Sequence, residues 1–388
     1  MTIKKAIIVC HDIVAGPPHA LRDYLRGEKT EEILFIGHPN MSVAANAIKN
    51  SYARIYRQGT ESRSFEASTG KLPEVLSYIK DSLLTFVWSL AKIRGKIDLF
   101  VGTGNLNAFI GLILKRIGKV DTVIYYVIDF IPKRFRNPLL NKLYHTIEKW
   151  CAQYASCTWN YAPAMIRERE RMWQRSFPHQ MVTPHGIFVR QENFLPRSSV
   201  HDCELVYMGF IHKFQGIMLA ITAVEALRSE FKNIKLLIIG KGDADEASIR
   251  EYVRLHELSA HIEFAGFIAD THAMEQIVAH AVLGMALYDP AHPFIGNTDP
   301  GKVKTYLGCG VPVIMTDCAP IAQKISAQQA GFIVPFDLDI VVKNIRTYLS
   351  QPDRIQLYRT NAFQMARSYD WNHIFTEALS VTMQQEQR

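Results

Sequence analysis

The sequence lacks the features of a secreted or membrane-spanning protein. No apolar run approaches the roughly 18 to 20 residues that a spanning helix needs. The N-terminus, MTIKKAIIVCHD, has neither the apolar core nor the small-residue cleavage site of a signal peptide. The 6 cysteines include no C-x-x-C pair, which argues against a disulfide framework and against a structural zinc site. We therefore expect a cytoplasmic protein from a reducing compartment.

Several catalytic and nucleic-acid signatures are also missing. The 14 histidines form no H-E-x-x-H motif, and there is no G-x-S-x-G nucleophile elbow, so zinc protease and serine hydrolase activities are disfavoured. There is no zinc-finger spacing and no aromatic-rich RNA-binding strand, so nucleic acid is the least favoured partner. Residues 243–245 and 337–339 each spell D-x-D, but neither triplet follows a strand as a metal-bridging motif would. We expect no metal site.

The length and the charge distribution indicate two domains with different partners. A chain of 388 residues is too long for one ordinary core, and two domains are expected. Residues 1–195 carry 27 Lys and Arg against 16 Asp and Glu, or +11, whereas residues 196–388 carry 17 against 21, or −4. A basic first half suits an anionic bilayer or an acidic small molecule.

Short apolar segments alternate with helical ones along both halves, which predicts two doubly wound α/β domains. The polar segment 192–202, ENFLPRSSVHD, is typical of a linker between the two domains. The expected strands are residues 5–10, 32–36, 98–101, 123–129 and 181–187 in the first half, and 205–208, 235–239, 262–264, 282–287 and 311–314 in the second. A tandem of such domains has a cleft facing the carboxyl ends of both sheets, where ligands are expected.

The stretch 299–314, DPGKVKTYLGCGVPVI, predicts a loop, a short helix and a buried strand. Free N–H groups in the first helical turn, beside Lys302 and Lys304, suit a phosphate. A basic helix start on a solvated face is the alternative. In the first half, Asp129 follows a strand at the edge where α/β folds bind ligands, although an Asp there also serves as a helix N-cap.

The apolar helix expected over residues 76–94 has two interpretations. Its run from residue 82 to residue 91 is too short to span a bilayer, but it could lie against one, with Lys80, Lys92 and Arg94 on phosphate headgroups. Packing on the sheet gives a similar pattern. Lys133, Arg134 and Arg136, together with Lys115, Arg116 and Lys119, form a second candidate basic surface.

Four motifs of the second half, MGFIHKFQG, LLIIGKGD, FAGF and PGKVKTYLGCGVPVI, occur in the order and spacing of a known family. The chain resembles GT-B glycosyltransferases, nearest to retaining glycosyltransferase family 4 (group 1). The resemblance implies two Rossmann-like domains, 1–195 for the acceptor and 196–388 for the nucleotide sugar. It also implies that a final helix, about 371–386, crosses back to the first domain.

The resemblance also implies roles for individual residues. Asp129 faces the reacting sugar and Lys302 takes up charge on the diphosphate, so these two are the candidate catalytic residues. Lys213 substitutes for the usual cations of the loop after the first strand, where Phe210 and Gln215 now stand. The donor-binding set is Gly16, Gly209, Lys213, Gly242, Phe267, Ile268, Asn297, Gly301 and Thr305. Thr305 and Asn297 occupy the places of two family carboxylates.

We therefore expect a hexosyltransferase-type enzyme that moves a sugar from a UDP- or GDP-linked donor to a glycan or lipid-linked acceptor in bacterial polysaccharide synthesis. It needs no cofactor or metal, because Lys302, Lys213 and helix amides stabilise the leaving diphosphate. We expect it in the cytoplasm, with peripheral contact at the inner face of the cell membrane. The alternatives are a sugar-nucleotide epimerase of the same fold and a non-catalytic glycosyltransferase-like assembly partner.

Overall fold

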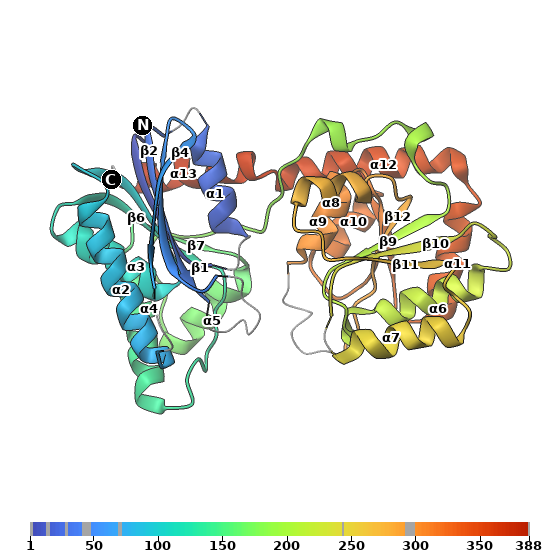
Figure 1. Ribbon diagram of the computed structural model, residues 1–388, viewed down its shortest axis with the longest axis horizontal. Coiled ribbons are helices and arrows are strands. Elements are labelled where there is room, and N and C mark those ends of the chain that lie inside the picture. Colours follow the sequence, from blue (N-terminus) through green and yellow to red (C-terminus); the bar gives the residue numbers. More distant parts are fainter. Residues whose placement is uncertain are drawn as a thin grey trace. The chain divides into compact units, whose positions relative to one another are not determined.

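The computed structural model describes residues 3–12, 16–27, 30–40, 48–68, 72–242, 244–291 and 299–386. The chain divides into two compact units (Figure 1). The first comprises Met1–Pro184 together with Ile374–Arg388, and the second comprises His185–His373. The division falls at Pro184, before the expected boundary at residue 195.

The first unit is built on a sheet of eight strands in its described part, in the order β4-β3-β2-β1-β5-β6-β7-β8. Strands β2, β1, β5, β6, β7 and β8 run parallel, and they are apolar along most of their length because helices cover both faces. The strands are β1 (Lys5–Asp12), β2 (Glu32–Pro39), β3 (Ser51–Arg57), β4 (Thr60–Ala67), β5 (Ile97–Thr103), β6 (Val120–Val127), β7 (Cys157–Asn160) and β8 (Gln180–Val182).

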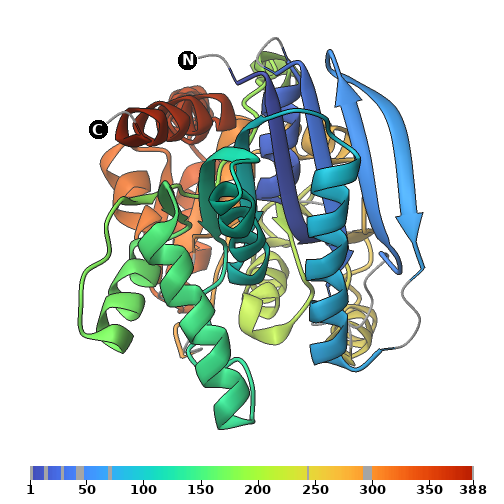
Figure 2. The ribbon, with the colours of Figure 1, turned by 90° about the vertical axis from the view of Figure 1, so that its left-hand side faces the viewer.

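Helices cover both faces of this sheet. Figure 2 shows α2, α3 and α4 side by side on one face, whereas α1 lies on the other. The C-terminal helix also packs on this unit, since Trp159 donates its indole N–H to Thr382 at 3.0 Å and its ring stacks on Phe375. The helices are α1 (Pro17–Arg26), α2 (Glu74–Ala91), α3 (Asn105–Arg116), α4 (Pro138–Tyr154), α5 (Pro163–Trp173) and α13 (Trp371–Glu386).

The second unit has a parallel sheet of six strands in its described part, in the order β11-β10-β9-β12-β13-β14. This order reverses direction between β9 and β12, which is the switch point at which doubly wound sheets bind ligands. Its strands are β9 (Glu204–Met208), β10 (Lys235–Ile239), β11 (Ile262–Gly266), β12 (Leu283–Ala286), β13 (Val313–Thr316) and β14 (Gly331–Val334).

Helices on both faces complete the second unit, and two separate apolar clusters lie between them and the sheet. The helices are α6 (Ile217–Leu227), α7 (Ala244–Leu255), α8 (Thr271–Val278), α9 (Gly301–Gly308), α10 (Ile321–Ala327), α11 (Leu338–Leu349) and α12 (Pro352–Ala366), with a short 3₁₀ helix η3 (Lys213–Gln215) before α6. The expected class, two Rossmann-like doubly wound α/β domains, is confirmed.

The structure differs from the sequence analysis in two places. Strands β3 and β4 form an antiparallel hairpin at the sheet edge that was not predicted, because most side chains of β4 are exposed and polar. The expected linker, residues 192–202, packs into the second unit instead. Phe194 stacks on Phe363 with ring centroids 4.8 Å apart, and buried Asn193 donates to Glu275 at 2.9 Å.

Candidate donor site

The candidate site of the second unit lies at the switch point between β9 and β12. Strand β9 ends in Tyr207 and Met208, and Tyr288 follows β12 by two residues. Helix α9 packs on both strands, because the hydroxyl of Tyr306 accepts the N–H of Met208 at 2.6 Å and donates to the carbonyl of Met285 at 3.4 Å. Loops from separate parts of the sequence therefore meet where α/β folds bind ligands.

Lys302 is the centre of this site. It stands in the first turn of α9, and its ammonium lies 4.5 Å from the ring centroid of Tyr207 and 4.8 Å from that of Tyr288. It donates to the side-chain carbonyl of Gln215 at 3.2 Å. Both aromatic rings are buried, so the electron-rich ring faces replace much of the water around the cation.

The charge of Lys302 is not neutralised within the described part of the chain. Its ammonium donates to a neutral amide, and no described carboxylate forms an ion pair with it. Burial consequently lowers the pKa of Lys302 to about 7. A partly buried cation with neutral neighbours, at an edge where α/β folds bind ligands, is suited to receiving an anion.

Glycines allow the backbone to approach this lysine closely. Gly209 has φ 135°, and a β-carbon there would lie 3.2 Å from the Lys302 ammonium. Gly216 has φ 75°, and a β-carbon there would lie 1.5 Å from the carbonyl oxygen of Leu287. Both positions therefore require glycine because of their positive φ. A side chain at Gly209 would also crowd Lys302, and one at Gly216 would clash with Leu287.

Lys213 differs from Lys302 because its charge is paired. Its ammonium lies 3.6 Å from Asp245, and its side chain is 62% exposed. Asp245 also accepts the backbone N–H of Lys213 at 3.1 Å and lies 3.2 Å from His212. The backbone bond from Lys213 and the two nearby cationic side chains hold the pKa of Asp245 below its ordinary value. Asp243, the other acid of that D-x-D triplet, lies outside the described residues.

Lys304 has a structural role that the sequence did not reveal. Its side chain is fully buried and donates to Asp299 at 2.5 Å and to the carbonyl of His185 at 2.6 Å. Asp299 in turn accepts the backbone N–H of His185 at 3.0 Å. Lys304 thus ties the loop before α9 to the start of the second unit, instead of joining Lys302 at the expected phosphate site.

The other expected donor residues are distributed around the same edge. Thr305 hydrogen-bonds back to the carbonyl of Gly301 at 3.3 Å, and a β-carbon at Gly301 would lie 2.8 Å from His185. The backbone N–H of Gly242 donates to Glu246 at 2.7 Å. After β11, Phe267 is 74% exposed, while Ile268 packs on the core. Asn297 lies outside the described residues.

In the first unit, the expected residues lie at the carboxyl ends of strands. Asp129 follows the end of β6 by two residues; its side chain reaches solvent, but the surrounding protein raises the pKa of its carboxyl. Gly16 has φ 107° and precedes α1, where its carbonyl accepts the N–H groups of His19 and Ala20, both at 3.1 Å.

A polar cluster at the end of β1 was missed by sequence reasoning. Buried Asp12 accepts from His19 at 2.7 Å and from the hydroxyl of Tyr52. Next to it, His11 lies 3.5 Å from Asp81 of α2. The only local signal is the pair of polar residues at the end of the first strand, since the partners are far away in sequence.

Asp81 carries a negative charge inside the first unit. His38, which is fully buried, lies 3.3 Å from it and also hydrogen-bonds Ser51 at 2.9 Å and Thr85 at 2.8 Å. Burial alone would raise the pKa of Asp81, but hydrogen bonds from His11 and His38 hold it well below its usual range. The charged carboxylate therefore stabilises this end of the sheet.

Comparisons with known proteins agree with this geometry. Residues 202–351 match the family described as Glycosyl transferases group 1. A segment of 169 residues is 24% identical to the phosphatidyl-myo-inositol mannosyltransferase of Mycolicibacterium smegmatis, and it covers 43% of this chain and 41% of that relative.

Solved structures match over nearly the whole chain. Anabaena HepE in complex with UDP superposes with a TM-score of 0.63 at 13% identity, covering 97% of this chain and all of that one. Sucrose-phosphate synthase from Thermosynechococcus elongatus gives a TM-score of 0.66 at 14% identity, covering 99% and 98%. Residues 202–351 of the second unit are thus similar to the group 1 glycosyltransferases, and the chain as a whole has the GT-B fold.

Proposed function

We propose that this protein transfers a hexosyl group from a UDP- or GDP-linked sugar to an acceptor hydroxyl, with retention of the anomeric configuration and without a metal. The observation that carries the proposal is the partly buried Lys302 ammonium, which lies among neutral groups at the β9–β12 switch point. A nucleotide sugar brings a diphosphate, and this cation would neutralise the charge that develops as the diphosphate leaves.

The rest of the donor site follows from this placement. Gly209 and Gly301 keep the backbone close to the phosphates, and the exposed Lys213 supplies a second cation at the rim. Gly242 borders the same loop, because it forms a bridge with Ile211. Phe267 and Ile268 would contact the base, and Thr305 and Asn297 the ribose and the sugar.

The acceptor would use the first unit. Asp129 orients or stabilises the reacting sugar through its carboxylate, and Gly16 leaves its backbone open to a phosphate or an acceptor. A glycan on a lipid diphosphate makes best use of the basic first half. We propose that the reaction belongs to polysaccharide or lipid-linked glycan synthesis, at the inner face of the cell membrane. HepE has been solved with UDP, with UDP-glucose and with UDP and glucose, which supports this donor class.

Nucleotide binding measured by thermal unfolding tests the donor site. UDP, GDP, UDP-glucose and GDP-mannose are compared on the wild type, Lys302→Ala and Lys343→Ala, the last an exposed lysine on α11. A ligand at 100 times its Kd stabilises by about 2.7 kcal/mol, so at least one nucleotide should raise the melting temperature by several degrees. Lys302→Ala should lose this shift and Lys343→Ala should keep it. If no nucleotide stabilises the wild type, the non-catalytic assembly partner is favoured.

Turnover without an acceptor tests the epimerase. Incubation of the bound nucleotide sugar alone should leave its sugar configuration unchanged. Formation of an epimer under these conditions would contradict the proposed transferase activity.

A further inference from the structure

Helix α2 has its polar and apolar faces reversed relative to an ordinary helix on a sheet. Its buried side chains are mostly polar, namely Ser77, Asp81, Thr85 and Ser89, with Trp88. Its outer face carries a stripe of aliphatic side chains, each at least 41% exposed: Leu76, Ile79, Leu83, Val87 and Leu90. Core packing therefore does not explain the apolar character of this helix, and the exposed stripe indicates a partner.

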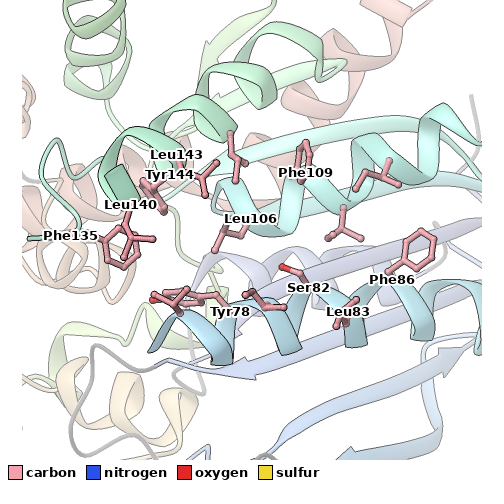
Figure 3. Close-up of a pocket in the computed structure, with 15 residues that line it drawn as sticks. Tyr78, Ser82, Leu83, Phe86, Leu106, Phe109, Phe135, Leu140, Leu143 and Tyr144 are labelled. Atoms are coloured by element: carbon pink, nitrogen blue, oxygen red, sulfur yellow. The ribbon is translucent and has the colours of Figure 1, made fainter. Parts of the chain in front are cut away.

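The apolar surface continues into a groove between α2, α3 and α4. The cavity there has a volume of about 500 Å³, and its walls are almost entirely apolar side chains (Figure 3). Leu83 and Phe86 line the cavity from α2, and Phe109 of α3 and Leu143 of α4 line it from the other side. This volume lies in the range of small-ligand sites, but the walls offer very few polar groups to orient a polar ligand.

Cations gather at one end of the groove. Figure 3 places Phe135, Tyr78 and Leu140 at this end and Phe86 at the opposite one. Residues 130–147 contain four basic residues and no acidic one. Arg134 donates to Tyr78 at 2.6 Å and pairs with Glu74, whereas Lys133, Arg136 and Lys142 are exposed and make no ion pair with any described residue.

We propose that the groove holds the hydrocarbon chain of the lipid that carries the acceptor, with the phosphate of that lipid on the cations at the Phe135 end. This inference rests on the proposed glycosyl transfer and specifies its acceptor as an anionic amphiphile. Charge complementarity selects this occupant, because an apolar groove that ends in unpaired cations matches a long chain with a phosphate head. Asp129 precedes Lys133 by four residues. The cations proposed to bind the phosphate therefore lie close in sequence to the proposed catalytic carboxylate.

Chain-length dependence tests the groove directly. Binding of dodecyl phosphate and of butyl phosphate to the full-length protein is measured by calorimetry, with the amphiphile kept monomeric. The longer chain should bind at least roughly a hundredfold more tightly, because each buried methylene contributes to affinity. Ser82 lines the groove, so Ser82→Trp should fill it and weaken dodecyl phosphate binding at least about tenfold. Ser82→Ala is the matched control and should bind like the wild type.

Further variants separate the groove from a general membrane surface. Leu143→Trp fills the opposite wall and should repeat the effect of Ser82→Trp, which guards against a single misfolded variant. Leu90→Glu alters the exposed stripe outside the groove and should leave dodecyl phosphate binding unchanged. Lys133→Ala with Arg136→Ala should weaken dodecyl phosphate binding and reduce its dependence on salt.

Three results would overturn the proposal. One is equal affinity for the long and the short chain, and another is undiminished dodecyl phosphate binding by both tryptophan variants. The third is loss of dodecyl phosphate binding in Leu90→Glu, which would indicate that the exposed stripe binds the amphiphile instead of the groove. UDP or GDP binding is measured on the same variants. If nucleotide binding is absent while the chain-length effect persists, the proposed donor binding is contradicted, whereas the proposed lipid binding in the groove is not.

Discussion

Lys302 and Lys304 lie two residues apart on α9, and their ammonium groups have opposite surroundings. That of Lys304 is satisfied by Asp299 and a backbone carbonyl, whereas that of Lys302 faces two aromatic rings and a neutral amide. One lysine therefore contributes to the fold, and the other is available to an anion. The predictions below separate these roles.

Donor binding should be coupled to proton uptake by Lys302. Because burial lowers the pKa of Lys302 to about 7, much of the free protein is uncharged there above neutral pH, and a bound diphosphate raises that pKa again. Binding of a nucleotide sugar at about pH 8.5 should take up nearly one proton, and at about pH 6 almost none. Calorimetry in buffers with different ionisation enthalpies measures this uptake, which should vanish in Lys302→Met.

The same pKa shift predicts how stability depends on pH without ligand. Between about 7 and the ordinary value of 10.5, the unfolded chain binds more protons at Lys302 than the folded one. The contribution of Lys302 to the free energy of unfolding should thus rise with pH across this window. Urea unfolding of the wild type and Lys302→Met would show a steeper rise for the wild type, and parallel curves would contradict the shift.

Removing the acid that pairs with Lys304 should be more damaging than removing the pair. Asp299→Asn leaves a fully buried ammonium without its charge partner and should lower the free energy of unfolding by about 3 kcal/mol. The double variant Asp299→Asn with Lys304→Met should recover much of that loss. Urea unfolding checks both, and additive losses would show that the pair does not interact as described.

Two glycines with the same backbone conformation should differ in their tolerance of a side chain. Gly216 and Gly266 both have φ 75°, but a β-carbon at Gly266 meets nothing within 4 Å, whereas one at Gly216 meets the carbonyl of Leu287. Gly266→Ala should cost about 1 kcal/mol from conformation alone. Gly216→Ala should cost more than about 3 kcal/mol and weaken nucleotide binding, because Gln215 next to it contacts Lys302. Comparable losses in urea unfolding would contradict this account.

Asp129→Asn should lower kcat by roughly a hundredfold or more, through loss of charge stabilisation at the reacting sugar. Nucleotide affinity should stay unchanged, because Asp129 is not among the proposed donor-binding residues, all of which except Gly16 belong to the second unit. Asp121→Asn is the control, since Asp121 lies near the start of the same strand and pairs with Lys96 at 2.5 Å. Release of nucleoside diphosphate from the bound nucleotide sugar provides the measurement. An unaltered rate in Asp129→Asn would remove this residue from the mechanism.

The alternation of short apolar strands with helices was sufficient to predict the fold class, because buried parallel strands are nearly continuous apolar runs. The pattern did not predict strands β3 and β4, since the exposed edge strand TESRSFEA lacks such a run. Residues 76–94 were predicted to form a helix. The spacing of the apolar residues shows which side chains share a face, but not which face is buried. Which face is buried depends on the neighbours, here the polar cluster around Asp81 and His38.

The candidate site was predicted in its location and only partly in its chemistry. The role of Lys302 stays a prediction, and its aromatic surroundings were not predicted because they join residues that lie far apart in sequence. In the sequence, Lys304 resembles Lys302. The direction of each side chain depends on its position around the axis of α9. The role of Thr305 stays a prediction, as does that of Asn297.

The packing of α13 on the first unit affects how the protein can fold during synthesis. The ribosome makes residues 1–184 first, but the helix that covers Trp159 follows only after the entire second unit. Until then, the indole N–H of Trp159 lacks Thr382, and Tyr24 lacks its contact with Thr376. The second unit is therefore an insertion within the first, and the nascent first unit must wait, incomplete, until the final helix leaves the ribosome.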